Sequence, residues 1–339
     1  MRVIQIKSQN EMEVIQASVP EPLFGEVLLK INYVGFCGSD LNTFIGCNPM
    51  VKMPVIPGHE IGATVEHIAS GVPESIKKEM IVTVNPYTNC GYCSSCRAGR
   101  INACANNETF GVQRSGAMCD YIVVPWQKII PTLGLSPHHS ALVEPMSVGF
   151  HAVSRGKVTD NDTVMVIGCG MIGIGAIVRA SLRGATVIAV DLDDDKLSLA
   201  KELGASYTIN TNTENLHSKL MDITEGFGSD VVIEAVGCPE TYRCAIDEVA
   251  FAGRVVFIGY SKREVNFQTK LFVQKELDIL GSRNALPDDF RAVIKYFKLN
   301  KFDKERLISE IVLPSEAFEA MCRWAAAPAK IFRILVDFN

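Results

Sequence analysis

The sequence lacks any long, unbroken run of apolar residues. Its most apolar stretch, TVMVIGCGMIGIGAIV at residues 163–178, is interrupted by glycines and is shorter than a membrane-spanning helix requires. The opening segment MRVIQIKSQNEMEV alternates like a β-strand and has none of the continuous apolar core of a signal peptide. We therefore predict a soluble, cytoplasmic protein that has no membrane partner.

An excess of positive charge is also missing. The chain carries 33 Lys and Arg against 38 Asp and Glu, a formal net charge of −5, and the basic residues are scattered. A nucleic-acid-binding surface would need a basic patch, so we expect no nucleic-acid partner. Internal repeats and low-complexity segments are absent too. With 47% hydrophobic residues, a chain of 339 residues can bury the cores of two domains.

Cysteine, in contrast, is plentiful. In a cytoplasmic protein the eleven cysteines are expected to be metal ligands or buried thiols rather than disulfides. Four of them follow the pattern C-x2-C-x2-C-x7-C within NCGYCSSCRAGRINAC, namely Cys90, Cys93, Cys96 and Cys104. Four thiolates complete a tetrahedral zinc shell and leave no place for a substrate, so this site is predicted to be structural. A ferredoxin-type iron–sulfur cluster would instead have a three-residue last gap followed by Pro.

A second group of possible metal ligands is spread over three glycine- or proline-flanked segments, GFCGSD, PGHEIG and LVEPMSVG. They supply one thiolate, one imidazole and two carboxylates, from Cys37, His59, Glu60 and Glu144. This mixture suits a borderline-soft ion such as zinc that keeps an open coordination position. Each residue alone is weak evidence, and the prediction depends on their order together with the cysteine stretch and the cofactor motif.

The cofactor motif lies in DTVMVIGCGMIGIGAIVRASLRGATVIAVD. An apolar strand is followed by Gly168, Gly170 and Gly173 in G-x-G-x-x-G spacing, then by a helix to about Leu182 and a second strand that ends on Asp191. This order predicts dinucleotide binding, with the pyrophosphate at the helix N-terminus and the acid on the adenosine ribose. Because further acids follow Asp191 and no Arg is near, we predict NAD rather than NADP.

Four more apolar segments, ASYTIN, DVVIEAVG, RVVFIGY and LDILGS, are expected to complete a parallel sheet of six strands. The predicted fold is therefore α/β. Residues 146–280 form the dinucleotide domain. Residues 1–145 and 281–339 form a β-rich domain that carries both metal sites, and AKIFRILVDF is expected to return as a strand of its sheet.

The chain resembles the zinc-dependent medium-chain dehydrogenase/reductase family, in its sorbitol dehydrogenase and sugar-acid (L-galactonate-type) dehydrogenase branch. GHE, the cysteine stretch and EPMSVG carry the resemblance, which covers essentially the whole chain. It implies a GroES-like catalytic domain beside a Rossmann domain. It also implies two zinc ions, one catalytic and one structural, and a homodimer or homotetramer.

The resemblance implies roles for individual residues. Cys37 and His59 would bind catalytic zinc, with Glu60 or Glu144 as a further ligand, Ser39 as acceptor of the substrate proton and Asp40 as the group that holds the zinc histidine. Cofactor contacts would come from Gly168, Gly170, Met171, Ile172, Gly173, Asp191, Ala235, Gly237, Gly259, Ser282, Arg283 and Asn284.

Two positions depart from the family pattern. Asn42 replaces a histidine that relays the proton to solvent, so the proton must leave by another route. Gly62 stands one place earlier than the usual glycine, and Ala63 occupies the usual position. We expect a local backbone adjustment there without loss of zinc.

The expected activity is oxidation of a secondary hydroxyl of a polyol or sugar acid to a ketone. Zinc would lower the pKa of the alcohol and NAD would take the hydride. An L-threonine 3-dehydrogenase or another zinc alcohol dehydrogenase is the main alternative. A zinc-ribbon nucleic-acid-binding protein and a zinc-free quinone reductase fit less well.

Overall fold

The computed structural model describes residues 1–339, which divide into two compact units. Unit 1 comprises Met1–Pro145 and Leu286–Asn339, and unit 2 comprises Met146–Ala285. The sequence-based boundary at residue 281 is five residues too early. The backbone N–H of Ser282 still donates to the carbonyl of Phe257 in unit 2, which holds the start of this connection against its sheet.

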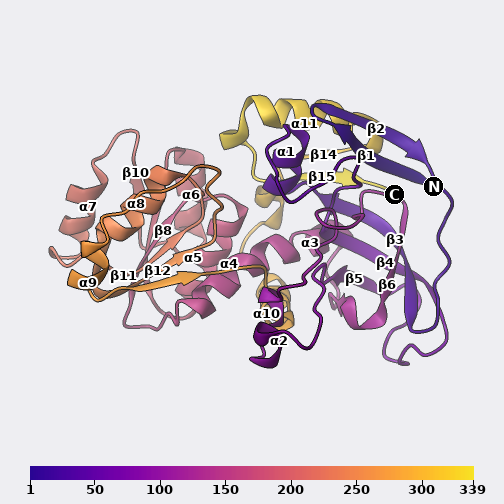
Figure 1. Cartoon of the computed structure of the whole chain (residues 1–339), viewed down its shortest axis with the longest axis horizontal. Helices are drawn as coiled ribbons and strands as arrows, with labels where there is room; N and C mark the ends of the chain where they lie inside the picture. The colour runs from indigo at the N-terminus through magenta and orange to yellow at the C-terminus, as the bar shows by residue number, and fades with distance from the viewer. The chain divides into compact units, whose positions relative to one another are not determined.

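Unit 1 is built on a mainly antiparallel seven-stranded sheet (Figure 1). Six strands follow the order β14-β15-β3-β4-β5-β7, and β6 pairs with β3 outside this path. The sequence analysis predicted that the C-terminal segment would return to this sheet. This is confirmed, because β15 pairs antiparallel with β3. The opening segment, which was predicted to be a strand, forms a separate hairpin of two antiparallel strands, β1 and β2.

The elements of unit 1 have the following bounds. The strands are β1 (Arg2–Ser8), β2 (Glu11–Gln16), β3 (Glu26–Gly35), β4 (Glu60–Ile68), β5 (Ile81–Val84), β6 (Tyr121–Pro125), β7 (Ile129–Pro131), β14 (Glu310–Val312) and β15 (Ile334–Asp337). The helices are α1 (Gly38–Phe44), α2 (Ser94–Arg97), α3 (Pro137–Ala141), α10 (Pro287–Lys298) and α11 (Ala317–Ala326). Short 3₁₀ turns are η1 (Ile101–Ala103), η2 (Trp126–Lys128), η3 (Lys304–Leu307), η4 (Pro314–Glu316) and η5 (Pro328–Lys330).

The core of unit 1 lies on strand β3. Its alternate residues Val27, Leu29 and Ile31 are fully buried, as a strand that presents one face to a core requires. The pairing of β3 with β4 shifts by one residue between Ile31 and Tyr33, opposite Ala63 and Gly62. The backbone adjustment expected from the displaced glycine is therefore found at that place.

Unit 2 contains a six-stranded, all-parallel sheet with the order β10-β9-β8-β11-β12-β13 (Figure 1). Its strands are β8 (Thr163–Ile167), β9 (Thr186–Asp191), β10 (Tyr207–Asn210), β11 (Ser229–Glu234), β12 (Val249–Phe257) and β13 (Asp278–Gly281). Its helices are α5 (Met171–Leu182), α6 (Asp194–Glu202), α7 (Leu216–Ile223), α8 (Pro239–Glu248) and α9 (Lys270–Gln274), and α4 (Val143–Arg155) enters it from unit 1.

The central strands of unit 2 are continuous apolar runs, because a parallel sheet is covered by helices on both faces. Val164, Met165 and Val166 of β8 are all fully buried. The strand order reverses beside β8, where β9 lies on one side and β11 on the other. The predicted doubly wound six-stranded sheet is thus confirmed. None of the helices in either unit has the length and apolar content needed to cross a membrane.

Candidate active site

The donor atoms of Cys37, His59 and Glu60 converge in unit 1, all within 4.8 Å of one another. Strand pairing explains why. Gly35 at the end of β3 pairs with Glu60 at the start of β4. Cys37 follows the one strand by two residues and His59 precedes the other by one, so both lie at the same corner of the sheet.

This cluster fits a bound cation. The Nδ1 atom of His59 and the Oε1 atom of Glu60 are buried, and neither has a hydrogen-bond partner. Buried polar atoms normally find a partner, because desolvation without one is costly. A thiolate, an imidazole and a carboxylate are also the donors that zinc accepts in sites with an open position.

Cys37 and His59 shift each other's pKa. Burial alone would raise the pKa of the Cys37 thiol, but the charge and hydrogen bond of His59, together with the charge of Arg333, bring the pKa below its usual value. Burial alone would lower the pKa of His59, but Cys37, Asp40 and Glu144 together raise it well above its usual value. Each group therefore stabilises the charged form of the other, and a bound metal ion would likewise stabilise the Cys37 thiolate.

Glu60 is completely buried and has one charged partner, Arg333 of the segment that precedes β15. Its Oε2 atom lies 3.1 Å from Nε of Arg333, whose Nη1 donates to the carbonyl oxygen of Phe36 at 2.6 Å. Burial raises the pKa of Glu60 well above its usual value, and Arg333 opposes this shift. Arg333 thus helps to keep a carboxylate charged inside the protein.

Glu144, near the start of α4, is held separately. Its carboxylate accepts a hydrogen bond from the hydroxyl of Tyr87, which is itself buried. Burial raises the pKa of Glu144, while the charge of His59 opposes the rise, so the carboxylate lies near His59. It is outside the close group formed by Cys37, His59 and Glu60.

Ser39 and Asp40 lie in the first turn of α1. The Oγ atom of Ser39 is shielded from solvent and has no hydrogen-bond partner, so this hydroxyl is available to a ligand. Oδ2 of Asp40 accepts from the backbone N–H of Cys37 at 2.9 Å, which fixes the loop that carries the thiol. Its Oδ1 atom makes no hydrogen bond, so Asp40 influences His59 here through its charge alone.

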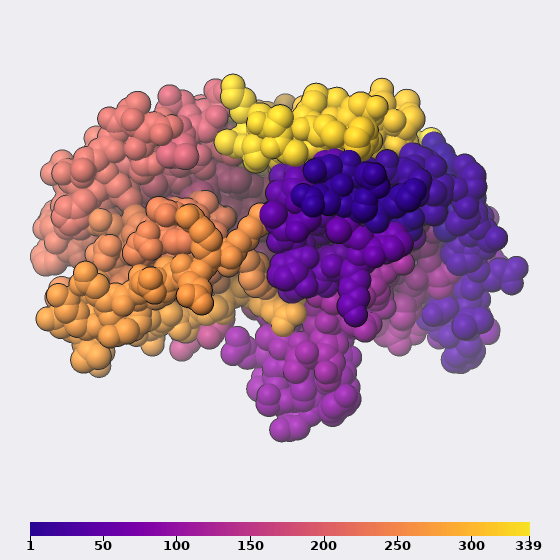
Figure 2. All heavy atoms as spheres, turned by 45° about the horizontal axis from the view of Figure 1, so that its top comes forward, coloured from indigo at the N-terminus to yellow at the C-terminus, as the bar shows by residue number.

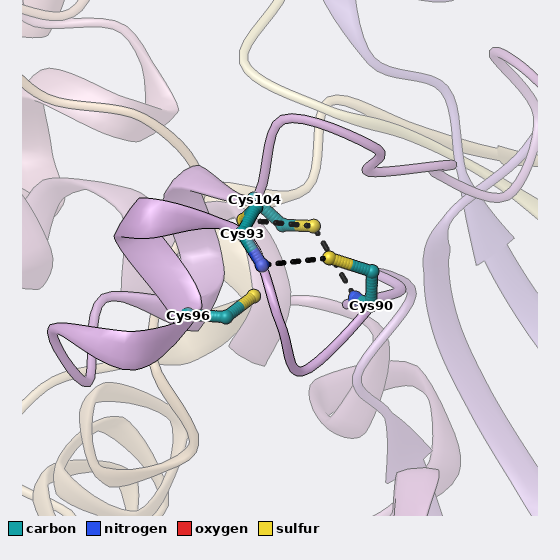
Figure 3. A group of neighbouring side chains, drawn as sticks. All are labelled: Cys90, Cys93, Cys96 and Cys104. Carbon is teal, nitrogen blue, oxygen red and sulfur yellow. Dashed lines mark hydrogen bonds between the residues drawn. The ribbon is translucent and has the colours of Figure 1, made fainter.

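The four cysteines of the second site face one another (Figure 3). Their sulfur atoms lie within 4.8 Å of one another, and no disulfide joins them. Backbone N–H groups of Cys90 and Cys93 donate to cysteine sulfurs at 3.3 and 3.4 Å, which is favourable for thiolates. A hydrogen bond from Ser95 is the main reason that the pKa of Cys93 falls to about 5.

The cysteine segment stands out from the rest of unit 1. Figure 2 shows residues of this part of the chain, in purple, as a lobe that projects from the surface. Its helices are only the four-residue α2 and the three-residue η1, and apolar residues such as Tyr92 are exposed. Such a segment cannot be held by a core of its own, which favours a structural ion there.

In unit 2 the glycine motif has the predicted turn geometry. Gly168 has a φ of +94°, and a Cβ on Gly173 would lie 1.7 Å from the Gly168 carbonyl oxygen, so neither position admits a side chain. Gly170 is the N-cap of α5, and open space surrounds the position where its Cβ would lie. Asp191 accepts from the backbone N–H of Cys169 at 2.6 Å and therefore supports the same turn.

The remaining predicted cofactor residues follow the ends of parallel strands, at the sheet edge where open α/β sheets bind their ligands. Ala235 and Gly237 follow β11, Gly259 follows β12, and Ser282, Arg283 and Asn284 follow β13. The buried Glu234 organises the first of these turns. Its Oε1 atom accepts from the backbone N–H groups of Val236 and Gly237 at 2.9 and 2.8 Å.

Two family models match the chain. The alcohol dehydrogenase GroES-like domain matches residues 24–134, and the zinc-binding dehydrogenase model matches residues 172–298. The L-galactonate-5-dehydrogenase of Escherichia coli K12 is 30% identical over 91% of both chains. The chain belongs to the zinc-binding alcohol dehydrogenase family.

Solved structures of family members agree with this assignment. The E. coli alcohol dehydrogenase RspB, complexed with NADH, has a TM-score of 0.90 at 28% identity over 99% of both chains. A protein from Sinorhizobium meliloti bound to NADP has a TM-score of 0.91 at 29% identity, over 99% of this chain and 98% of the other. Curated relatives named sorbitol dehydrogenase and L-threonine 3-dehydrogenase also match the sequence. As a member of this family, the chain is a zinc- and NAD(P)-dependent dehydrogenase that acts on CH–OH groups.

Sequence reasoning missed three residues of these sites. Arg333 lies in the segment predicted as a strand, and a charge inside its apolar run KIFRILVDF indicates a buried partner. Glu234 is likewise a charged residue in an apolar run, at the end of DVVIE. Tyr87 precedes the cysteine stretch by three residues, and nothing in its surroundings distinguishes it.

Replacing Arg333 by Met should lower the free energy of unfolding by about 3–5 kcal/mol, because it leaves a buried carboxylate and a buried carbonyl unpaired. Urea unfolding of the dehydrogenase measures the loss. Arg323→Met is the matched control, since Arg323 pairs with Glu310 at the surface and is worth about 1 kcal/mol or less. Equal losses in the two variants would contradict the role of Arg333.

Proposed function

We propose that this dehydrogenase oxidises a secondary hydroxyl of a polyol or sugar acid to a ketone and uses NAD as hydride acceptor. The convergence of Cys37, His59 and Glu60, with Glu144 nearby, carries the proposal. Carboxylates rather than a second thiolate surround the ion, which makes the site polar and suited to a substrate with several hydroxyl groups. Two relatives that are each 30% identical to the chain are named L-galactonate-5-dehydrogenase and sorbitol dehydrogenase.

Cys37, His59 and Glu60 would hold the catalytic zinc, and Ser39, Tyr87 and Glu144 would act around it. Bound zinc supplies Lewis acidity that brings the pKa of a hydroxyl toward neutrality, and bound NAD accepts the hydride. The unpartnered Ser39 hydroxyl is the group available to take the substrate proton. Asn42 cannot pass that proton on by changing its charge, so the proton must leave through water or another hydroxyl.

The choice of Glu60 over Glu144 as the third ligand follows from their partners. Glu60 belongs to the close group of donor atoms, and its Oε1 atom lacks a hydrogen bond. Glu144 is already engaged by Tyr87. We therefore assign Glu60 to the metal and Glu144 to the polar wall beside it. The same convergence of donors weighs against a zinc-free quinone reductase.

A panel of hexitols, aldonates and L-threonine, with NADH formation followed at 340 nm, tests the proposed activity. Polyols or aldonates should give the highest kcat/KM, with NAD as the better cofactor. Faster turnover of L-threonine would instead select the L-threonine 3-dehydrogenase alternative. Light scattering of the same preparation tests the homodimer or homotetramer that the resemblance favours.

Replacing Asp191 by Ala should weaken NAD binding at least about tenfold, because two charge-assisted hydrogen bonds to the ribose hydroxyls are lost. NADP binding should change little, because removal of the negative charge also removes repulsion of its phosphate. The ratio of the two dissociation constants isolates this contact, since the hydrogen bond that Asp191 accepts from the Cys169 amide supports the turn for both cofactors.

Asp195→Ala is the control for this measurement. Asp195 is exposed and carries a negative charge in the same segment, but β9 ends at Asp191 and not at Asp195. Its NAD affinity should stay at the level of the unmodified protein. Equal losses of NAD and NADP affinity in Asp191→Ala would refute the ribose contact.

A further inference from the structure

A third cluster of metal-ligating side chains lies in unit 1, outside both sites described above. His138 and His139 of α3 and Glu305 of η3 place their donor atoms within 4.8 Å of one another. Nε2 of His138 lies 2.9 Å from Oε1 of Glu305, and Nε2 of His139 lies 2.8 Å from the same oxygen. Two imidazoles and one carboxylate, from segments 166 residues apart, thus meet at one point.

The two rings are held in this orientation by their surroundings. Nδ1 of His139 lies 2.8 Å from Oγ of Ser136, so the second ring nitrogen already has the oxygen partner that metal-bound histidines use. The rings of His138 and Tyr33 form a T-shaped contact with centroids 5.6 Å apart. Side-chain exposure is 25% for His138 and 17% for His139, so neither ring rotates freely in solvent.

The backbone on each side is also fixed. Strand β4 packs directly on the first turn of α3, where a Cβ on Gly62 would lie 1.8 Å from the carbonyl oxygen of Pro137. On the other side, Asp303 caps η3 by accepting from the backbone N–H of Glu305 at 3.1 Å. The three donors are therefore presented by two rigid segments rather than by mobile loops, as a metal site requires.

An ion can reach this cluster. Glu305 is 53% exposed, and His139 borders a surface cavity of about 470 Å³ lined otherwise by residues 300–304. Lys304 adds a nearby positive charge, but its ammonium is engaged by the oxygen atoms of Asn300 and Phe297 at 2.7 and 3.4 Å. That charge makes the cluster a weaker site than the four thiolates, and hence an exchangeable one.

We propose that His138, His139 and Glu305 bind an exchangeable Zn²⁺ ion that ties α3 to η3. Two imidazoles and a carboxylate are a known zinc donor set with room for water, whereas Mg²⁺ and Ca²⁺ prefer oxygen ligands throughout. The assignment stands apart from the catalytic proposal, because none of the three residues belongs to the Cys37 cluster or to the cysteine segment.

Equilibrium dialysis against Zn²⁺ with metal analysis tests the site. Tag-free protein, first dialysed without added metal to set a baseline, should take up one further ion per chain. The thermal midpoint should rise with the concentration of Zn²⁺, because the ion binds only when α3 and η3 are both folded. Mg²⁺ or Ca²⁺ at millimolar concentration should not displace the ion.

His139→Ala and Glu305→Gln should each remove this uptake or weaken it more than about 10–100-fold, the loss typical for an outer partner of a metal ligand. Glu305→Gln changes an exposed side chain without changing its shape, so folding is preserved even where His139→Ala disturbs it. His217→Ala is the control, because His217 pairs with Glu248 at 3.0 Å and no third metal-ligating side chain joins them. The Zn²⁺ uptake of this variant should match that of the unmodified protein.

Three results would overturn the proposal. One is a stoichiometry that stays at the baseline in saturating Zn²⁺. Another is a further ion that persists in both His139→Ala and Glu305→Gln. The third is equal loss of that ion in His217→Ala, which would place it elsewhere on the surface.

Discussion

Cys37→Ser should abolish alcohol oxidation while the protein still binds NADH. A serine hydroxyl is not ionised near neutral pH and is a poor zinc ligand, so the catalytic ion is lost or held without its thiolate. The Lewis acidity of a bound metal is worth several kcal/mol, so kcat should fall at least about 10³-fold. NADH binding is retained because the glycine motif and Asp191 belong to unit 2, whereas Cys37 belongs to unit 1.

NADH fluorescence and metal analysis of the same sample separate the two effects. Cys47→Ser is the matched control, since Cys47 is an exposed thiol ten residues further along and is not part of a metal-ligating group. It should leave both zinc content and kcat unchanged. An active Cys37→Ser protein with its full zinc content would remove Cys37 from the mechanism.

Cys93→Ser should lower stability far more than it lowers the specific activity of the protein that remains folded. Structural zinc contributes about 10–16 kcal/mol of binding free energy in small zinc-dependent peptides, and part of this is lost when one thiolate is removed. We expect zinc content to fall by one ion per chain and the thermal midpoint to fall by at least several degrees. Differential scanning calorimetry and metal analysis measure both changes.

Cys322→Ser is the control for this change, because Cys322 is an exposed thiol on α11 and has no metal-ligating neighbour. Its midpoint should stay within about 1 °C of the unmodified value, as is usual for surface substitutions. The structural assignment would fail if Cys93→Ser stayed fully folded with all its zinc, or if it folded normally and lost all activity.

Much of the fold could be predicted because its signals are local. The G-x-G-x-x-G spacing requires a tight turn before a helix, and α5 ends at Leu182 as its apolar pattern predicted. The six parallel strands follow from apolar runs at regular intervals. The domain boundary was misplaced by five residues because the connection from Ser282 to Ala285 is irregular and carries no periodic pattern.

The sequence indicated the donor residues of the candidate site but not the residues that surround them. Cys37, His59 and Glu60 stand in short motifs whose residue types reveal metal chemistry. The partners of these ligands are ordinary residues from distant segments, such as Tyr87 and Arg333, and only the folded chain shows that they meet. Nothing in the sequence around His138 and His139 indicates a metal site, because Glu305 lies 166 residues away from His139.

The sequence by itself determined the family, the all-parallel sheet of unit 2, and the residue types that can bind zinc and a dinucleotide. These depend on local spacing and on side-chain chemistry, both of which are present in the unfolded chain. Only the tertiary structure decided that Glu60 joins Cys37 and His59 while Glu144 pairs with Tyr87. That division depends on which buried charges the fold brings together, because a buried carboxylate must be satisfied by whichever partner lies within reach.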